Sequence, residues 1–260
     1  HNIDHIFSLE LQHLYQKEDP FYRAIKQFQP FGGLLSLNTD QENFNINQNR
    51  QAKTGKIEGK LDYYYILSPK ANLNFTFGVT DVSQDFNSSI FQIMDSGNRE
   101  VFSENFLNND VSFRFLDAYA AFHYRFVSGI FTLDPGFTLH SYKTVTRQLG
   151  SEEDNSFSFF RPDFRILLKF KDSETLRLVY RSTREFTDIN NLAEGYIFRN
   201  YNSFFQGNPN LEAAFFNRIN LNYQSINIFN FTNIFANLSY SVRDNAIQNT
   251  TQVEGINSIR

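Results

Sequence analysis

The stretch KIEGKLDYYYIL, residues 56–67, alternates apolar and polar side chains with a period of two. The apolar positions are Ile57, Gly59, Leu61, Tyr63 and Tyr65, and the positions between them are Glu58, Lys60, Asp62 and Tyr64. Successive side chains of a strand point to opposite faces, so this pattern predicts a β-strand with one apolar and one charged face. Residues 73–80, LNFTFGVT, repeat the alternation after a short turn that contains Pro69. The two stretches together predict a β-hairpin.

The composition of the 260-residue chain favours strands and turns over helices. It has 31 Phe, 13 Tyr and 30 Asn, with no Trp and a formal net charge of −4. The absence of Cys excludes disulfide scaffolds, thiol catalysis and Cys-ligated metal sites. The mild acidity gives no reason to expect a nucleic-acid partner. No apolar run reaches the roughly 18 residues of a transmembrane helix.

The same alternation predicts nine strands along the chain. They cover residues 3–16, 53–67, 72–82, 109–126, 130–147, 157–171, 174–187, 211–224 and 230–249. The predicted connections are alternately long (17–52, 83–108, 148–156 and 188–210) and short (68–71, 127–129, 172–173 and 225–229). Outer-membrane barrels have this asymmetry, with short turns at one end and long loops at the other. We therefore expect an apolar band near the short-turn end of each strand.

The apolar face of each strand is expected to meet lipid and the polar face to line a lumen. In residues 161–171, Phe164, Ile166 and Phe170 alternate with Asp163 and Arg165. Tyrosines recur on the apolar rows, as they do in interfacial girdles; they are Tyr63, Tyr65, Tyr124, Tyr180, Tyr223 and Tyr240. A soluble β-sandwich would also alternate, but it would need an unusually ring-rich core.

Residues 157–250 contain motifs that resemble the carboxy-terminal half of TonB-dependent outer-membrane receptors of the Bacteroidota type. These motifs are Phe160-Arg161-Pro162, the turn at residues 171–174, the Leu-Arg-Leu-x-Tyr-Arg strand at 176–181, and Gly-Asn-Pro-Asn-Leu at 207–211. The resemblance implies an all-β, antiparallel, transmembrane up-and-down β-barrel of 22 strands in the bacterial outer membrane. We expect residues 1–260 to be a single portion of that barrel wall, about nine strands, without the plug domain.

The resemblance also implies a function and partners. The function is TonB-dependent import of a nutrient ligand of the siderophore, oligosaccharide or peptide class. The partners would be outer-membrane lipid, the protein's own plug domain, the TonB complex and a surface lipoprotein. Two other classes stay open: a plugless outer-membrane channel or structural or assembly barrel, and a soluble β-rich adhesin or carbohydrate-binding module.

A basic patch is the first candidate site. If the turn at Asp172 and Ser173 pairs Lys171 with Thr175, then Lys169 lies opposite Arg177, and Arg165 lies opposite Arg181, all facing the lumen. Like charges directly opposite one another destabilise a sheet, so an acidic partner is expected. It would be a neighbouring carboxylate such as Asp134, an acidic face of the plug, or an anionic substrate.

Aromatic residues of the long connections are the second candidate site, because their rings could stack on sugars or cap a ligand. They are Phe91, Phe102, Phe106, Tyr196, Tyr201, Phe204 and Phe205. The alternative is that these rings pack the loops against one another, because loops of this length need a small core to stay ordered.

No catalytic or metal-binding constellation is apparent in the sequence. The histidines at 5, 13, 123 and 140 do not stand in metal-ligand spacing, and no Gly-x-Ser-x-Gly motif occurs. We therefore expect neither an enzyme nor a cofactor.

Overall fold

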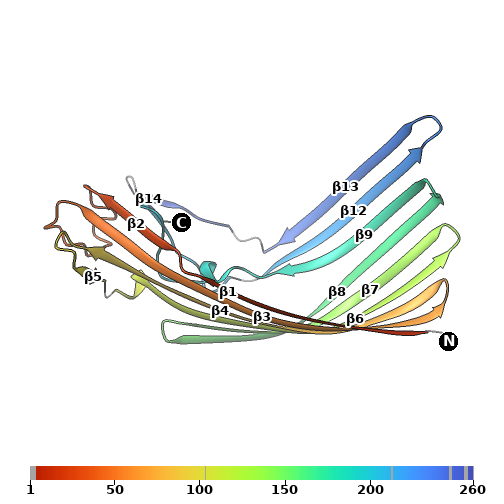
Figure 1. The fold of residues 1–260 in the computed structure, drawn as a ribbon, viewed down its shortest axis with the longest axis horizontal. Helices are drawn as coiled ribbons and strands as arrows, with labels where there is room; N and C mark the ends of the chain where they lie inside the picture. Colours follow the sequence, from red (N-terminus) through yellow and green to blue (C-terminus); the bar gives the residue numbers. More distant parts are fainter. Residues whose placement is uncertain (1–3, 103, 212, 246–247, 255–256, 260) are drawn as a thin grey trace.

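The computed structural model describes residues 4–102, 104–211, 213–245, 248–254 and 257–259. Nine long strands form one strongly curved antiparallel sheet (Figure 1). In spatial order they are β1 (His5–Glu18), β3 (Phe44–Ser68), β4 (Ala71–Ile93), β6 (Asn108–Ser128), β7 (Phe131–Gln148), β8 (Ser151–Lys171), β9 (Glu174–Glu185), β12 (Ala214–Asn227) and β13 (Thr232–Asp244). Each strand pairs with its neighbour along the chain, apart from short added elements, so the predicted up-and-down topology is confirmed.

Short elements lie at the long-connection end of the sheet. β2 (Phe21–Lys26) pairs with β3, and β5 (Arg99–Val101) pairs with β4. A separate small sheet contains β10 (Ile197–Asn200), β11 (Ser203–Phe205), β14 (Gln252–Glu254) and β15 (Asn257–Ile259). The helices of the described residues are two single 3₁₀ turns, η1 (Asn105–Leu107) and η2 (Ile189–Asn191), and neither has the length that a membrane crossing needs.

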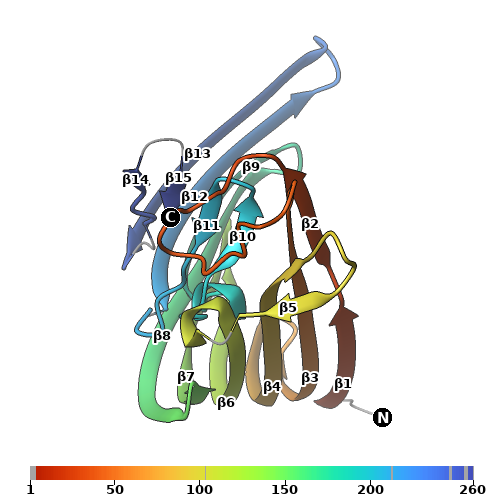
Figure 2. The ribbon, with the colours of Figure 1, turned by 90° about the vertical axis from the view of Figure 1, so that its left-hand side faces the viewer.

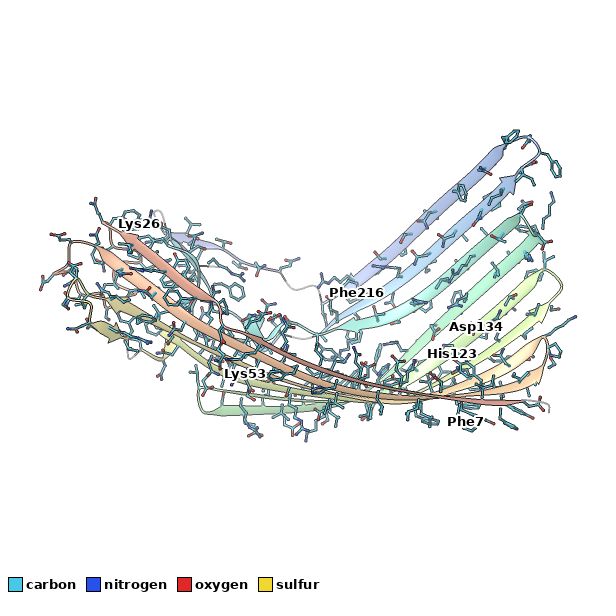
Figure 3. The ribbon with its side chains drawn as sticks, in the orientation of Figure 1. Phe7, Lys26, Lys53, His123, Asp134 and Phe216 are labelled. Atoms are coloured by element: carbon cyan, nitrogen blue, oxygen red, sulfur yellow. The ribbon has the colours of Figure 1, made fainter. Side chains whose placement is uncertain are left out.

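The two faces of the sheet follow from the register, because directly paired residues share a face. One row on the concave face runs Glu58, Thr80, Asp117, Tyr142 and Phe157 across five strands. The next row, on the convex face, runs Gly59, Val79, Ala118, Ser141 and Ser158. Figure 3 shows Phe7 on the convex side of the sheet, and His123 and Asp134 on the concave side.

The convex face carries an exposed apolar band near the short-turn end. Phe7 and Leu9 of β1 are both 67% exposed, and Phe77 of β4 is 55% exposed. Ion pairs mark where the band stops; on this face they join Arg114 to Asp81 at 2.7 Å, Lys143 to Asp154 at 2.9 Å and Arg147 to Glu152 at 2.9 Å. The band therefore lies where the sequence predicts it, and the strands continue well past it.

Three predicted connections are wrong in extent because strands continue beyond the apolar band. Residues 44–52 belong to β3 and residues 83–93 belong to β4. The predicted loop at 148–156 is a two-residue turn, with positive φ at Leu149 (50°) and Gly150 (82°). Outside the apolar band the strands no longer need an apolar row, so the alternation that predicts a strand is lost while the backbone pairing persists. The predicted strand end at 249 is also wrong, since β13 ends at Asp244; residues 246 and 247 lie outside the described residues.

The connection between β9 and β12 folds over the concave face at the long-connection end (Figure 2). It builds two apolar clusters there with residues of the strands and of the other long connections. The first contains Phe31, Leu35, Leu37, Phe44, Ile46, Ile90, Phe102, Leu107, Phe198, Tyr201 and Phe204. The second contains Phe86, Val111, Phe113, Ile189, Leu192, Ala193, Ile197 and Phe205. The compact core of the described part therefore sits at this end, while the rest of the sheet is a single layer.

Candidate functional site

The predicted register of the basic patch is wrong by two residues. Arg181 lies opposite Asp163, not Arg165, and Arg165 lies opposite Val179. Similarly, Lys169 lies opposite Thr175, and Arg177 opposite Leu167. The two-residue turn closes Lys171 onto Glu174, and an irregularity between Lys169 and Lys171 shifts the ladder further. The directly opposed cation pairs expected between β8 and β9 are therefore absent.

Two of the four predicted basic residues have carboxylate partners. Arg165 faces Asp134 of β7 in register, with 4.0 Å between guanidinium nitrogen and carboxylate oxygen. Lys169 pairs with Asp172 at 2.6 Å. Asp134 is thus one carboxylate that does lie against the patch. Arg177 and Arg181 have no carboxylate within 4.0 Å among the described residues.

Arg218 of β12, which was not among the predicted site residues, lies directly opposite Arg181 on the concave face. The signal was present, because residues 214–224 alternate and place Arg218 on their polar face. A groove of about 570 Å³ brings Arg177, Arg181 and Arg218 together along β9, β12 and β13.

Two histidine–carboxylate pairs lie in the same concave wall. His123 of β6 hydrogen-bonds Asp163 of β8 at 3.1 and 3.2 Å, across Gly136 of β7. His140 is buried and hydrogen-bonds Asp117 at 2.9 and 3.0 Å. Gly136 on the polar face of β7 is the sequence feature that could have indicated the first pair. A glycine within a strand often marks a place where neighbouring groups approach closely. Among the described residues there is no group of three or more His, Asp or Glu placed to hold a metal ion.

The predicted loop aromatics are mostly used in packing. Phe102, Tyr201 and Phe204 are buried in the first cluster, and Phe205 is buried in the second. Tyr196 packs against the first cluster and stacks on Phe204, with ring centroids 4.9 Å apart. These five rings therefore pack the loops at the long-connection end.

Phe91 and Phe106 differ from the other five. Phe91 is not in a loop but in β4, on the convex face, where Arg99 covers its ring with 3.7 Å to the centroid. The prediction fails there because β4 extends to Ile93. Phe106 remains 38% exposed and meets Tyr196 edge-on, with ring centroids 5.9 Å apart.

Side-chain amides of the strands hold the backbone of the folded loop. The Gln48 amide donates to the Tyr196 carbonyl at 3.1 Å and accepts from the Phe198 N–H at 3.0 Å. The Asn109 amide oxygen accepts from the Gly195 N–H at 2.8 Å. Each amide substitutes for a strand neighbour that the loop lacks, so the buried loop backbone stays hydrogen-bonded.

Gln148 provides a third anchor on the same stretch of loop. Its amide donates to the Leu192 carbonyl at 3.1 Å and accepts from the Glu194 N–H at 3.3 Å. Tyr201 fixes the far side of the loop, because its hydroxyl donates to the Phe28 carbonyl at 2.5 Å. Burial raises the pKa of Tyr201 to about 12.

Comparison with known families agrees with this architecture. Residues 1–259 match the model of the outer membrane protein beta-barrel family. The chain belongs to that family. The protein is therefore an outer-membrane protein, its convex apolar band faces lipid, and its concave polar face is the lumen wall.

Two solved structures share the fold. The copper transporter OprC matches with a TM-score of 0.55 and 12% identity, over 90% of this chain and 35% of that chain. The P. aeruginosa protein FpvA, solved bound to heterologous pyoverdines, matches with a TM-score of 0.52 and 12% identity, over 93% of this chain and 31% of that chain. The chain thus spans about a third of the length of these relatives. No curated protein matches the chain.

Proposed function

We propose that the protein is a TonB-dependent outer-membrane receptor that imports a nutrient ligand. The observation that carries the proposal is the likeness of almost the whole chain to part of the OprC and FpvA chains, one named a transporter and the other solved with pyoverdines. The polar, charged lumen wall supports it, since a wet passage needs such a lining. Import, not catalysis, is the function that this arrangement favours.

The proposed mechanism starts with ligand capture at the mouth and continues along the lumen wall. The folded loop between β9 and β12 narrows the mouth on the lumen side, and its amide anchors hold it in place. A plug domain would close the passage, and the TonB complex would supply the energy to open it. Of the ligand classes that the family resemblance implies, anionic ligands suit the basic residues of β8, β9 and β12 best.

A plugless outer-membrane channel is the second candidate, because its wall would have the same chemistry. The soluble adhesin or carbohydrate-binding module loses its support, because the chain belongs to an outer-membrane family. A surface lipoprotein partner stays a prediction from the family resemblance.

Energy dependence separates import from passive flow. Cells that carry the full-length gene should accumulate a labelled ligand from a panel of ferric siderophores, oligosaccharides and peptides. A protonophore or deletion of TonB should reduce this accumulation at least tenfold. Accumulation that persists without energy, together with a steady conductance of the purified protein in planar bilayers, would contradict the proposal and support the channel.

A further inference from the structure

One cross-strand row of the lumen wall ends in two adjacent cations. The register places His123, Gly136, Asp163, Arg181 and Arg218 side by side on β6, β7, β8, β9 and β12. Asp163 is the carboxylate of this row, and it is hydrogen-bonded to His123. Arg181 and Arg218 therefore face each other directly, an arrangement that costs stability unless an anion lies between or above them.

The guanidinium groups of Arg177, Arg181 and Arg218 lack ion-pair partners in the described part of the chain. Several other cations of the wall have carboxylate partners: Arg165 faces Asp134, Lys60 pairs with Glu10 and Asp62, and Lys169 pairs with Asp172. Arg50, Arg125 and Arg161 on the same face also have no ion pair among the described residues. The three groove arginines differ from them because they lie together on two neighbouring strands. None of the three is on the edge strand β13, whose inward residues beside Arg218 and Asn220 are Ser241 and Ser239.

The groove that contains these arginines is rich in hydrogen-bond donors and has a suitable size. Asn220, Asn222 and Asn237 line it with the arginines, and its volume of about 570 Å³ is typical of small-ligand sites. The Asn237 amide donates to Asn222, which fixes the orientation of both side chains. Glu185 is the acidic residue of the lining, and it lies at the long-connection end, beyond Thr183.

We propose that Arg177, Arg181 and Arg218 form a binding site for a small polyanion, a ligand with two or more carboxylate or phosphate groups. Guanidinium groups match such groups bidentately, and three of them on one face recognise several acidic groups at once. This site deepens the proposed function, because it makes the imported ligand anionic. Equilibrium binding needs no energy source, so its test is independent of the uptake test.

The test is titration of purified full-length protein in detergent, at low salt, with inorganic pyrophosphate and with the tricarboxylate tricarballylate. We expect saturable binding of at least one probe by the wild-type protein. The double variant Arg181→Gln/Arg218→Gln should weaken it at least tenfold. The matched control is Arg125→Gln, which removes one exposed arginine from the same lumen face on β6, where it pairs with Asn72 of β4. This control should change the dissociation constant less than twofold.

A further variant separates site geometry from net charge. Arg181→Lys/Arg218→Lys keeps both charges but loses the planar forks, and we expect at least a threefold loss of affinity with normal folding. Three results would overturn the proposal: no binding of either probe by the wild-type protein, equal loss in Arg125→Gln, or undiminished binding in the double Gln variant. If the wild-type protein binds neither probe and the double Gln variant is less stable, carboxylates of the protein itself occupy the site.

Discussion

His123 on β6 and Asp163 on β8 are hydrogen-bonded over the intervening strand β7, at the position of Gly136. A Cβ atom on residue 136 would lie 2.0 Å from Cδ2 of His123, so only glycine leaves room for the ring. Tyr119 lies over Gly78 of β4 in the same way. Both contacts tie together strands of the lumen wall by side chains as well as by backbone pairing.

Replacing Gly136 with Ala should displace His123 and break its hydrogen bonds with Asp163. We expect a loss of about 1–3 kcal/mol in the free energy of unfolding, the usual cost of overpacking. Urea titration of the protein folded into lipid vesicles measures it.

The matched control for that variant is Gly59→Ala on the convex face, where the nearest atom, Cδ2 of Leu11, is at an ordinary 3.4 Å. In a His123→Ala background the cost of Gly136→Ala should disappear. An equal cost with and without His123 would show that the backbone, not the ring, requires glycine.

A charge in the convex band should be far more costly than one on the concave face. Phe77→Arg places a guanidinium against lipid, which costs about 2–4 kcal/mol near the bilayer midplane. Thr80→Arg, on the same strand, points to the lumen beside Glu58 and Asp117 and should fold normally. The shift in electrophoretic mobility between unheated and heated samples reports the folded fraction. Equal folding of the two variants would contradict the assignment of the faces.

Replacing Gln48 with Ala should loosen the folded loop without unfolding the barrel wall. The variant leaves the Tyr196 carbonyl and the Phe198 N–H without their partners, which costs about 1–3 kcal/mol locally. Faster amide hydrogen exchange in residues 192–198 is the expected readout. Gln84→Ala is the control, because Gln84 contacts Thr54 of the wall and makes no hydrogen bond with the described residues of the loop. Unchanged exchange in Gln48→Ala would show that the amide does not hold the loop.

The loop should also loosen at alkaline pH through Tyr201. Its pKa is about 12 in the folded protein and about 10 in an unfolded chain, so the folded state binds the proton more tightly. This contribution is fully present below about pH 10 and is lost as the pH rises towards 12. Limited proteolysis of the loop between pH 9 and 12 measures it. Tyr201→Phe should lose this pH dependence; an identical profile in both proteins would assign the transition to other groups.

The membrane-spanning part of the fold was predictable because lipid imposes a simple rule on it. Most outward side chains there are apolar, so the alternation in residues 56–67 and 73–80 identifies the strands, their faces and their antiparallel order. Beyond the ion pairs that end the apolar band, outward side chains no longer need to be apolar. The predicted strand boundaries are inaccurate there. β8 begins at Ser151, although residues 151–156 contain no apolar side chain.

The pairing partners of the basic residues could not be predicted from the sequence. Its residue types and lumen orientation could be read from the alternation, but a shift of two residues exchanged the partner of Arg181 from Arg165 to Asp163. A shift of two preserves the face of every side chain, so the apolar pattern cannot detect it. The amide anchors are less visible still, because Gln48 and Phe198 are 150 residues apart.

The anchors of the folded loop bind its main chain, at Leu192, Glu194, Gly195, Tyr196 and Phe198. Among these positions, Leu192 and Phe198 are buried in the apolar clusters and Tyr196 packs against the first of them. A Cβ on Gly195 would lie 2.3 Å from the Asn108 carbonyl oxygen. Glu194 is therefore the anchored position at which the side chain can change while the main-chain hydrogen bonds stay in place. A substitution at Glu194 would alter the contacts that the loop offers without moving its path. The path of the loop at the mouth of this barrel wall is thus set by hydrogen bonds to its main chain and by the side chains that it buries.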